Sequence, residues 1–340
     1  MRHPFHRTSS RIATLVLLTL VLAIGCRDSA SDKPQFAFVT NCVASFWNIA
    51  AVGAKVAAEE AGVEVTIIMP DGITDQTRKL EDLITRGTDG VAVSPINADN
   101  QIDILNKVAA ATNLLTHDSD APACNRLTYV GMDNYEAGRM CGQLVRNALP
   151  DGGDVMLYIG RLDQDNAKLR RQGCIDGIFG RAPDAARHDP PGESLSSEDG
   201  KYHVLGTLTD RTDRAKAKAN AEDTLTRHPD ISAMVGLFVY NPPAILEALE
   251  RAGKIGDVKV IAFDEDEVTL QAIRDGSIVG TVVQDPYQYG YESIRLLVGL
   301  HRGDSSILPP GGLIDVPPRV INNENLEEFW TTLKHQMATK

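Results

Sequence analysis

Residues 35–69 of the chain read QFAFVTNCVASFWNIAAVGAKVAAEEAGVEVTIIM and contain one complete strand–helix–strand unit. Residues 35–40 form an apolar run of strand length. Residues 46–61 have the length and spacing of a helix that ends at Gly62, a residue typical of a helix C-terminus. Residues 63–69 are rich in β-branched side chains and predict a second strand. Because a helix joins the two strands, we expect them to run parallel in one sheet.

The same alternation of apolar strands and amphipathic helices continues along the chain. Further strands are predicted at residues 90–94, 114–117, 154–159, 203–209, 233–238, 258–263 and 279–284. Further helices are predicted at residues 76–86, 100–111, 134–149, 167–180, 213–227, 243–252, 268–275 and 287–300. This pattern indicates an α/β fold whose parallel sheets are covered on both faces. So many units would overfill one sheet, so we predict two doubly wound parallel-sheet lobes.

Residues 181–201 interrupt this alternation. They contain Pro183, Pro190 and Pro191 with several glycine, serine and acidic residues, which predicts a long surface loop in the second lobe. This loop is either a passive insertion or an element that docks a partner.

The N-terminus has the pattern of an export signal. Arg2, Arg7 and Arg11 precede an apolar run at residues 12–25. This run of 14 residues is shorter than the about 20 helical residues that span a bilayer. It has the length of the apolar region of a signal peptide, and it ends in small residues that suit peptidase cleavage. We therefore predict that residues 1–25 are a signal peptide and that the protein is exported.

Cys26 directly follows this segment, with Ala23 three positions before it. The arrangement resembles the lipobox of bacterial lipoproteins, which implies that Cys26 is acylated and becomes the mature N-terminus. Residues 26–34 would then be a lipidated tether. The alternative is an ordinary secretory signal followed by an incidental cysteine.

The charge of the chain is acidic. Loss of residues 1–25 removes three arginines and no acidic residue, which changes the formal net charge from −12 to −15. An acidic surface argues against a nucleic-acid partner, because neutralising phosphates requires clustered Lys and Arg. It also provides no polybasic patch, so we expect membrane contact only through a lipid anchor.

The other cysteines are Cys42, Cys124, Cys141 and Cys174. An oxidising compartment permits disulfides, but spacing alone does not assign them. They are either small buried apolar residues or form one or two bridges, with Cys141–Cys174 and Cys42–Cys124 as the candidate pairs. Because no CxxC or zinc-type Cys/His spacing occurs, we expect neither a metal nor a cofactor.

Polar and aromatic side chains follow several predicted strands. They are Asn41, Phe46 and Trp47 near the first strand, Asp118 and Ser119 after residues 114–117, Phe238 and Asn241 near the end of residues 233–238, Asp264 after residues 258–263, and Gln284 at the end of residues 279–284. Carboxylates and amides suit vicinal hydroxyls, and aromatic rings add apolar contact area. The alternative for a single Asp is a helix N-cap, and for the adjacent aromatics it is core packing. The occurrence of Asp118, Asp264 and Gln284 after three strands favours a ligand site at this sheet edge.

The order of these elements resembles the type I periplasmic sugar-binding proteins, the ribose-binding family that feeds ABC transporters. The resemblance runs from about residue 35 to beyond residue 300. Short matches in the right order carry it: RGTDG at 86–90, SP at 94–95, Asp118, GMDN at 131–134, NAKLRRQG at 166–173, HPD at 228–230, AG at 252–253, FD at 263–264 and Gln284.

By position, the resemblance implies a set of ligand contacts. These are Phe46, Trp47, Asp118, Arg170, Asp264 and Gln284. The family's second-lobe aromatic and its asparagine fall near Thr212–Asp213 and near Phe238, and Asn241 is a candidate for the amide. The ribose proteins have an asparagine where this chain has Ala44 and an arginine where it has Ser119. The resemblance therefore implies a sugar ligand but does not specify ribose. Asn41 and Asp120 are candidate compensating groups, which would suit a differently arranged polyol or a larger sugar.

We find no sequence pattern of a catalytic site. GxSxG, GxxxxGK[ST] and HExxH are absent from the sequence. His117 beside Asp118 invites a general-base interpretation, and the alternative is a histidine packed at a strand end. A pair such as Asp118 and Asp264 suits ligand clamping better than glycoside hydrolysis. We expect the chain not to be an enzyme.

The expected function is that of an exported solute-binding protein. It would bind a sugar or related polyol between its lobes by hinge closure and deliver it to an ABC permease of the inner membrane. The alternative is a sugar sensor that presents its closed form to a membrane kinase or chemoreceptor. We expect a periplasmic monomer anchored through Cys26.

Each lobe is expected to combine two parts of the chain. The first lobe would comprise residues 35–133 plus 286–312, and the second lobe residues 134–285 plus 313–340. The hinge would lie near Asp133, Asp285 and Gly312, where the chain passes between the lobes.

Overall fold

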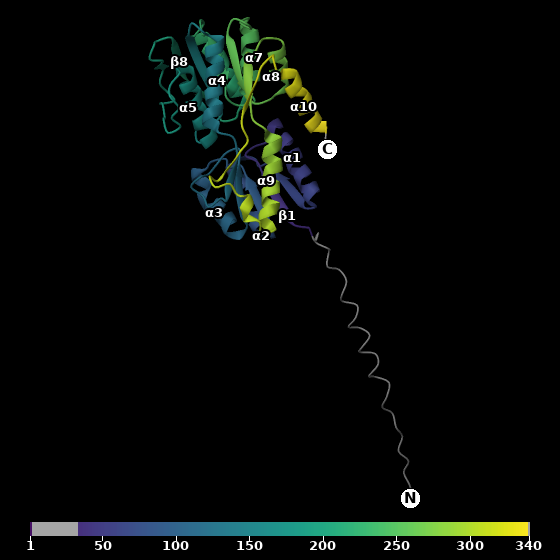
Figure 1. The fold of residues 1–340 in the computed structure, drawn as a ribbon. Helices are drawn as coiled ribbons and strands as arrows, with labels where there is room; N and C mark the ends of the chain where they lie inside the picture. Colours follow the sequence, from purple (N-terminus) through teal and green to yellow (C-terminus); the bar gives the residue numbers. More distant parts are fainter. Residues whose placement is uncertain (2–32, 339–340) are drawn as a thin grey trace. The chain divides into compact units, whose positions relative to one another are not determined.

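Two sheets, each covered by helices, organise the chain (Figure 1). The computed structural model describes Met1 and residues 33–338. The predicted signal peptide, Cys26 and most of the tether lie outside the described residues. From Gln35 onward the chain forms one compact unit, in which each sheet with its helices is called a lobe below.

The first lobe contains a six-stranded parallel sheet in the order β12-β5-β4-β3-β1-β2. Its strands are β1 (Gln35–Val39), β2 (Glu64–Ile68), β3 (Gly90–Val93), β4 (Asn113–His117), β5 (Thr128–Gly131) and β12 (Leu313–Asp315). Helices α1 (Ser45–Ala61) and α9 (Pro286–His301) cover one face, and α2 (Gly72–Arg86) and α3 (Ile102–Ala111) cover the other. Two short 3-10 helices are η1 (Asp99–Gln101) and η2 (Ser305–Ile307).

The second lobe contains a seven-stranded sheet in the order β13-β11-β10-β9-β6-β8-β7, with the edge strands β13 and β7 antiparallel. Its strands are β6 (Gly153–Ile159), β7 (Leu195–Ser196), β8 (Tyr202–Thr209), β9 (Ala233–Gly236), β10 (Lys259–Phe263), β11 (Gly280–Val283) and β13 (Arg319–Ile321). Helices α4 (Asn134–Ala148) and α5 (Asp165–Phe179) cover one face. Helices α6 (Arg214–Arg227), α7 (Asn241–Ala252), α8 (Glu267–Arg274) and α10 (Leu326–Ala338) cover the other.

The apolar strands form these sheets because both of their faces are buried. In β1, Phe36 and Phe38 pack against α1 and α9, whereas Ala37 and Val39 pack on the side of α2 and α3. Successive strand residues point to opposite faces, so a fully apolar strand supplies two cores at once. The predicted α/β fold with two doubly wound lobes is therefore confirmed.

The shortest elements of the fold were not predicted from the sequence. Strands β5, β7, β12 and β13 have two to four residues, which is too few for a periodic pattern to appear. Helix α10 was also missed, and within it only Leu326 and Trp330 are buried. So narrow an apolar stripe gives a weak helical signal.

The chain passes between the lobes three times. It leaves β5 through Asp133 to α4, and it leaves β11 through Asp285 to α9. The third passage was expected near Gly312, with residues 313–340 in the second lobe. Instead, β12 pairs with β5 in the first sheet, so the third passage lies between β12 and β13. Pro317 and Pro318 occupy this passage, and proline has no N–H to donate to a sheet.

The predicted surface loop at residues 181–201 contains only the two-residue strand β7. Its first half is held against α5 by charged side chains. The buried Asp176 pairs with Arg181 at 3.3 Å and with Arg187 at 2.7 Å, and Arg181 also pairs with Asp189 at 2.6 Å. The loop is therefore attached to its own lobe by an ion-pair network.

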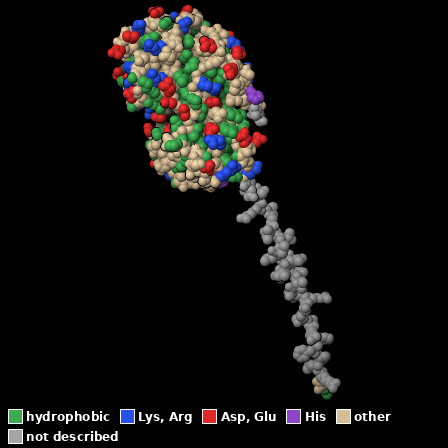
Figure 2. All heavy atoms as spheres, in the orientation of Figure 1, with side chains coloured by type: hydrophobic (Ala, Val, Ile, Leu, Met, Phe, Trp, Pro, Cys, Tyr) green, Lys and Arg blue, Asp and Glu red, His purple; other side chains and the backbone are tan. Residues whose placement is uncertain are grey.

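The surface of the described residues carries charges of both signs. Figure 2 shows Asp and Glu interspersed with Lys and Arg on the face in view. None of the described helices combines the length and the apolar character needed to cross a bilayer.

Candidate functional site

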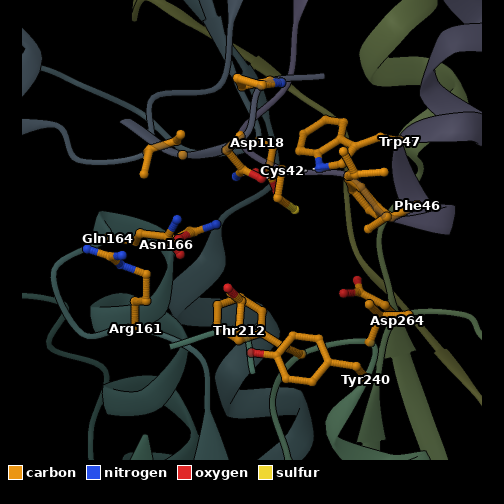
Figure 3. Close-up of a pocket in the computed structure, with 18 of the residues that line it drawn as sticks. Cys42, Phe46, Trp47, Asp118, Arg161, Gln164, Asn166, Thr212, Tyr240 and Asp264 are labelled. Atoms are coloured by element: carbon orange, nitrogen blue, oxygen red, sulfur yellow. Dashed lines mark hydrogen bonds between the residues drawn. The ribbon is translucent and has the colours of Figure 1, made fainter. Parts of the chain in front are cut away.

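A cavity of about 410 Å³ lies between the lobes, at the carboxyl ends of strands from both sheets (Figure 3). This is the edge at which doubly wound sheets bind ligands. The cavity is lined by eight of the residues predicted from the sequence: Asn41, Phe46, Trp47, Asp118, Arg170, Phe238, Asp264 and Gln284. The structure thus brings together side chains that are up to 243 positions apart in the sequence.

Asp118 provides a carboxylate from the first lobe. Its backbone has a left-handed conformation with a φ of 57°. The Asp118 N–H donates to Val130 O at 3.1 Å, and its carbonyl accepts from Tyr129 Oη at 2.7 Å. Its Oδ2 accepts from Asn41 Nδ2 at 3.1 Å and from Ser94 Oγ at 2.9 Å. These contacts fix the direction in which the carboxylate meets the cavity.

Asp264 provides the matching carboxylate from the second lobe. Its φ is 65°, its N–H donates to Val282 O at 2.8 Å, and its carbonyl accepts from Thr281 Oγ1 at 2.7 Å. Its Oδ1 accepts from Gln284 Nε2 at 2.7 Å, and Gln284 Oε1 accepts from Tyr289 Oη at 3.1 Å. Both carboxylates are therefore buried and oriented by hydrogen bonds to protein groups.

Burial controls the protonation of both groups. It raises the pKa of Asp118 to about 6, although the nearby positive charge of Arg170 opposes the shift. Burial also raises the pKa of Asp264, again opposed by Arg170. Removing an ionised carboxylate from water disfavours its charged form, which explains the direction of both changes.

Arg170 is the buried cation of the site, and 1% of its surface is exposed. Its two terminal nitrogens donate to Leu237 O and to Asn134 Oδ1, each at 2.9 Å. Its guanidinium carbon lies 3.7 Å from the centroid of the Phe263 ring. Among the described residues its Nε–H has no hydrogen-bond partner. The side chain is thus held by the second lobe while one donor remains unused.

The first-lobe aromatics serve both the core and the cavity. Phe46 and Trp47 are 6% and 2% exposed, and their rings meet edge to face at 4.8 Å between centroids. Trp47 Nε1 donates to Asn41 Oδ1 at 3.2 Å, and the Trp47 ring contacts Phe38 and His117. The alternative of core packing is therefore realised, although both residues also line the cavity.

The aromatic residues that line the cavity from the second lobe are held by a different set of contacts from those of the first lobe. The rings of Phe238 and Tyr240 stack with centroids 6.2 Å apart. Tyr240 Oη donates to Asp210 Oδ1 at 2.6 Å, and Asn241 Nδ2 donates to Asp210 Oδ2 at 2.8 Å. Asn241 Oδ1 in turn accepts from Phe238 N at 3.1 Å. Asn241 therefore positions the two aromatics, and its amide is occupied by protein groups.

Three predicted contact residues do not line the cavity. Asn241 is directed into its own lobe, as described above. Asp213 is the N-cap of α6, where its side chain accepts from the Ala215 and Lys216 N–H groups. Ser119 is buried beside β4, with its N–H donating to His117 O at 2.6 Å. Local capping thus directs the Asp213 side chain, whereas Asn241 is held by Asp210 from another strand end.

His117 does not face the cavity either. Its ring stacks on Phe38 with centroids 4.1 Å apart, and its Nε2 lies 3.2 Å from Val39 O. Complete burial lowers its pKa to about 3, so the ring stays neutral near pH 7. This placement supports a core role rather than that of a general base.

Several lining residues were missed in the sequence. They include Cys42, Arg161, Gln164, Asn166, Arg214 and Tyr240. One available signal was the spacing of Asn166 and Arg170, because residues four positions apart share a helix face. Asn166 is buried, and among the described residues its Oδ1 has no hydrogen-bond partner. It is a polar group left open toward the cavity (Figure 3).

A hydrogen bond joins the two lobes near the cavity. Asn97, which follows β3, donates through Nδ2 to Asp163 Oδ2 at 3.2 Å. Asp163 follows β6 and also accepts from Arg161 Nε at 2.8 Å. Arg161 lines the cavity, so this pair connects the cavity wall of the second lobe to the first lobe.

The cysteines in the described part of the chain are free. The candidate bridges Cys141–Cys174 and Cys42–Cys124 are therefore not formed, and Cys124, Cys141 and Cys174 are buried as small apolar residues. Within residues 33–338, no group of three or more His, Cys, Asp or Glu side chains is arranged to hold a metal ion.

A family model and curated relatives point to the same protein family. A family model described as a periplasmic binding protein domain matches residues 36–305. The ribose import binding protein RbsB of Salmonella typhimurium is 24% identical over 299 residues, which cover 86% of this chain and 93% of RbsB. The D-ribose/D-allose-binding protein of Pseudomonas aeruginosa is 22% identical over 334 residues, which cover 92% of this chain and 98% of that protein.

The solved structures agree. An ABC transporter solute binding protein of Burkholderia graminis, in complex with D-arabinose, has a TM-score of 0.77 and 26% sequence identity. The superposition covers 86% of this chain and 96% of that protein. These matches confirm the resemblance found in the sequence, and the family model spans most of the chain. The chain therefore belongs to the periplasmic binding protein family.

Proposed function

We propose that this chain is an exported solute-binding protein that captures a sugar or related polyol between its lobes and delivers it to an ABC importer. The observation that carries this function is the pair of buried aspartates, Asp118 and Asp264, which face one cavity from opposite lobes. Ionised carboxylates only accept hydrogen bonds, so they match the donors of a polyhydroxylated ligand. The aromatic side chains beside them offer apolar area to a sugar ring.

Hinge closure is the proposed mechanism. The three passages between the lobes are short, and the ligand groups come from both sides of the cavity. A ligand that contacts both lobes binds the closed form better than the open form, and this difference in affinity drives closure. The bond between Asn97 and Asp163 would form part of the closed state.

The import role is favoured over the sensor role by the relatives named above. RbsB is an import binding protein, and the Burkholderia graminis protein is an ABC transporter solute binding protein. The permease would then be the partner that recognises the two lobes in their closed arrangement.

Membership of the family accounts for a periplasmic location, and we propose that Cys26 anchors the chain to the membrane as a monomer. Metabolic labelling with a palmitate analogue in a bacterial host tests the anchor. The expected result is labelled protein in the membrane fraction, and Cys26→Ser should abolish the label. Equal labelling of this variant would contradict the anchor, and a dimer in light scattering would contradict the monomer.

A ligand screen tests the function itself. The chain from residue 27 onward, which contains the whole compact unit, would be screened by thermal shift against pentoses, hexoses, pentitols and inositols. A ligand at 100 times its Kd stabilises the protein by about 2.7 kcal/mol. Asp264→Asn should reduce the shift, whereas Asp266→Asn should retain it, because Asp266 is the N-cap of α8 outside the cavity. If amino acids or peptides produce the shift and no polyol does, the proposed function is wrong.

A further inference from the structure

In the part of the chain that the structure describes, the two aspartates of the cavity lack an ionic partner. Among the described residues, no Lys, Arg or His nitrogen lies within 4.0 Å of a carboxylate oxygen of Asp118 or Asp264. The hydrogen bonds to Asp118 come from Asn41 and Ser94, which are neutral. The side-chain bond to Asp264 comes from Gln284, which is also neutral. Buried carboxylates are ordinarily paired with a cation.

Arg170 compensates only part of this charge. Its terminal nitrogens donate to Leu237 O and Asn134 Oδ1 rather than to either aspartate. It therefore acts on both carboxylates at longer range, as one positive charge for two negative ones.

The other charged groups near the cavity do not restore the balance. Arg161 pairs with Asp163, so it adds no net charge. Arg214 lies at the exposed start of α6, where water screens its charge. Glu265 is buried behind Asp264, and burial together with the charges of Asp264 and Asp285 raises its pKa well above the usual range. The inner part of the cavity thus carries an excess of negative charge when both aspartates are ionised.

We propose that the natural ligand is a cationic polyol, an amino sugar whose ammonium group binds between Asp118 and Asp264. This inference rests on the proposed function and narrows its substrate class. An ammonium group supplies three donors and the missing positive charge at once. A neutral sugar supplies donors but leaves the charge uncompensated.

The geometry of Asp118 suits this role. Its Oδ2 is occupied by two neutral donors, whereas its Oδ1 has no hydrogen-bond partner among the described residues. Its side chain points into the cavity (Figure 3). The faces of nearby aromatic rings also attract a cation, and Phe46, Trp47, Phe238 and Tyr240 all line the cavity.

Matched pairs of ligands test the inference. Isothermal titration calorimetry at pH 7 would compare D-glucosamine with D-glucose, and D-galactosamine with D-galactose, on the chain from residue 27 onward. We expect at least one amino sugar to bind about tenfold tighter than its neutral counterpart or better, because a hydrogen bond to a charged group exceeds a neutral one. N-acetyl-D-glucosamine, which keeps the nitrogen but not the charge, should lose this advantage.

Variants then locate the charge. Asp118→Asn should reduce the preference for the amino sugar by about tenfold or more, while Asp266→Asn should leave it unchanged. Asparagine tolerates the left-handed backbone that Asp118 adopts, and circular dichroism would verify that the variant folds. Asp264→Asn provides the same test from the other lobe.

The outcomes separate the two proposals. Neutral sugars that bind as tightly as their amino counterparts overturn the cationic ligand and leave the sugar-binding function intact. A preference for amino sugars that survives both Asp118→Asn and Asp264→Asn overturns the assignment of the charge to these residues. Binding of a ligand that is not a polyol overturns the sugar-binding function and the inference together.

Discussion

The two halves of the cavity share one backbone arrangement but support it with different side chains. Asp118 follows β4 and is bound by β5, whereas Asp264 follows β10 and is bound by β11. In both halves, the aspartate directly after the strand has a positive φ, and its carboxylate is directed toward the cavity. The repetition follows from the doubly wound topology, in which equivalent strands end at equivalent positions.

The supporting side chains differ in where they come from. Asp118 is held by Asn41 and Ser94, which follow strands inside the first sheet. Asp264 is held by Gln284, which stands beside Asp285 at a passage between the lobes. The first half is therefore fixed within one lobe, whereas the second half is linked to the hinge. The shared fold therefore positions both carboxylates, whereas the local hydrogen-bond partners determine whether a carboxylate is connected to the hinge.

The two lobes also share a close helix crossing, which lies within each lobe: α4 packs on α5 in the second lobe, and α1 packs on α9 in the first. In the second lobe, a Cβ on Gly138 of α4 would lie 2.1 Å from Arg170 O of α5. In the first lobe, a Cβ on Gly290 of α9 would lie 1.9 Å from Ala50 O of α1. Each crossing therefore needs a glycine, because any side chain would force the backbones apart. In the second lobe this contact also sets the position of Arg170.

The largest difference between the two halves of the cavity should appear in the free energy of unfolding when an aromatic side chain is removed from each of them. Trp47→Ala removes a fully packed ring from the first-lobe core, and we expect a loss of about 3–5 kcal/mol in the free energy of unfolding. Phe238→Ala removes a half-buried ring and should cost less than half of that. Urea denaturation of both variants measures the difference. Equal losses would show that the two walls are built alike.

The second prediction concerns ligand affinity. Asp118→Ala and Asp264→Ala should each weaken binding of the cognate ligand by about 2–5 kcal/mol, because donors are left without an acceptor in a buried site. Calorimetry on both variants checks this, with Asp266→Asn as the unaffected control. A variant that binds like the wild type would remove its aspartate from the site.

The third prediction concerns pH. The pKa of Asp118, raised to about 6, means that the folded chain binds this proton more tightly than the unfolded chain. Its contribution therefore favours folding at low pH and is lost as the pH rises through 6. Asp118→Asn should be more stable than the wild type at pH 7 by about 3 kcal/mol, and the difference should vanish near pH 4.

His117 changes the stability with pH in the opposite direction from Asp118. Its lowered pKa means that stability is lost as the pH falls below the value of a free histidine. Because the wild type and the Asp118→Asn variant both contain His117, its effect cancels in their difference. Denaturation curves between pH 4 and 8 measure that difference. If the difference in free energy of unfolding between the two proteins does not change with pH, burial does not raise the pKa of Asp118. Asp264→Asn should change stability in the same direction, because burial raises its pKa too.

The smallest expected effect belongs to the bond between the lobes. Asn97→Ala removes the donor to Asp163 Oδ2 without touching either aspartate of the cavity. A partly exposed hydrogen bond of this kind contributes about 1 kcal/mol. We expect a ligand dissociation rate that rises up to about fivefold, measured by stopped-flow fluorescence. The melting temperature should fall slightly, because Asn97 Oδ1 also accepts from the Asn100 N–H at 3.0 Å and the variant loses this bond as well. An unchanged dissociation rate would show that this bond does not stabilise the closed state.

Much of the site was predictable from the order of strands and the residues that follow them. Asp118, Asp264 and Gln284 were found because strand ends in parallel sheets meet at one edge. Asp213 was misplaced because a residue at a helix start turns its side chain back to cap the helix. Tyr240 was missed because its direction depends on a hydrogen bond to Asp210, a residue from another strand end.

Local sequence was sufficient to predict the alternating strands and helices, the two lobes and the sheet edge at which the cavity lies. The periodic spacing of apolar residues and the glycines at helix ends are features of short segments, so they can be identified in the sequence alone. Tertiary packing was needed to show that β12 belongs to the first sheet, that Trp47 is a core residue and that, among the described residues, neither cavity aspartate has an ionic partner. These features arise from residues far apart in the chain that meet through packing, and no local pattern records which groups will be neighbours.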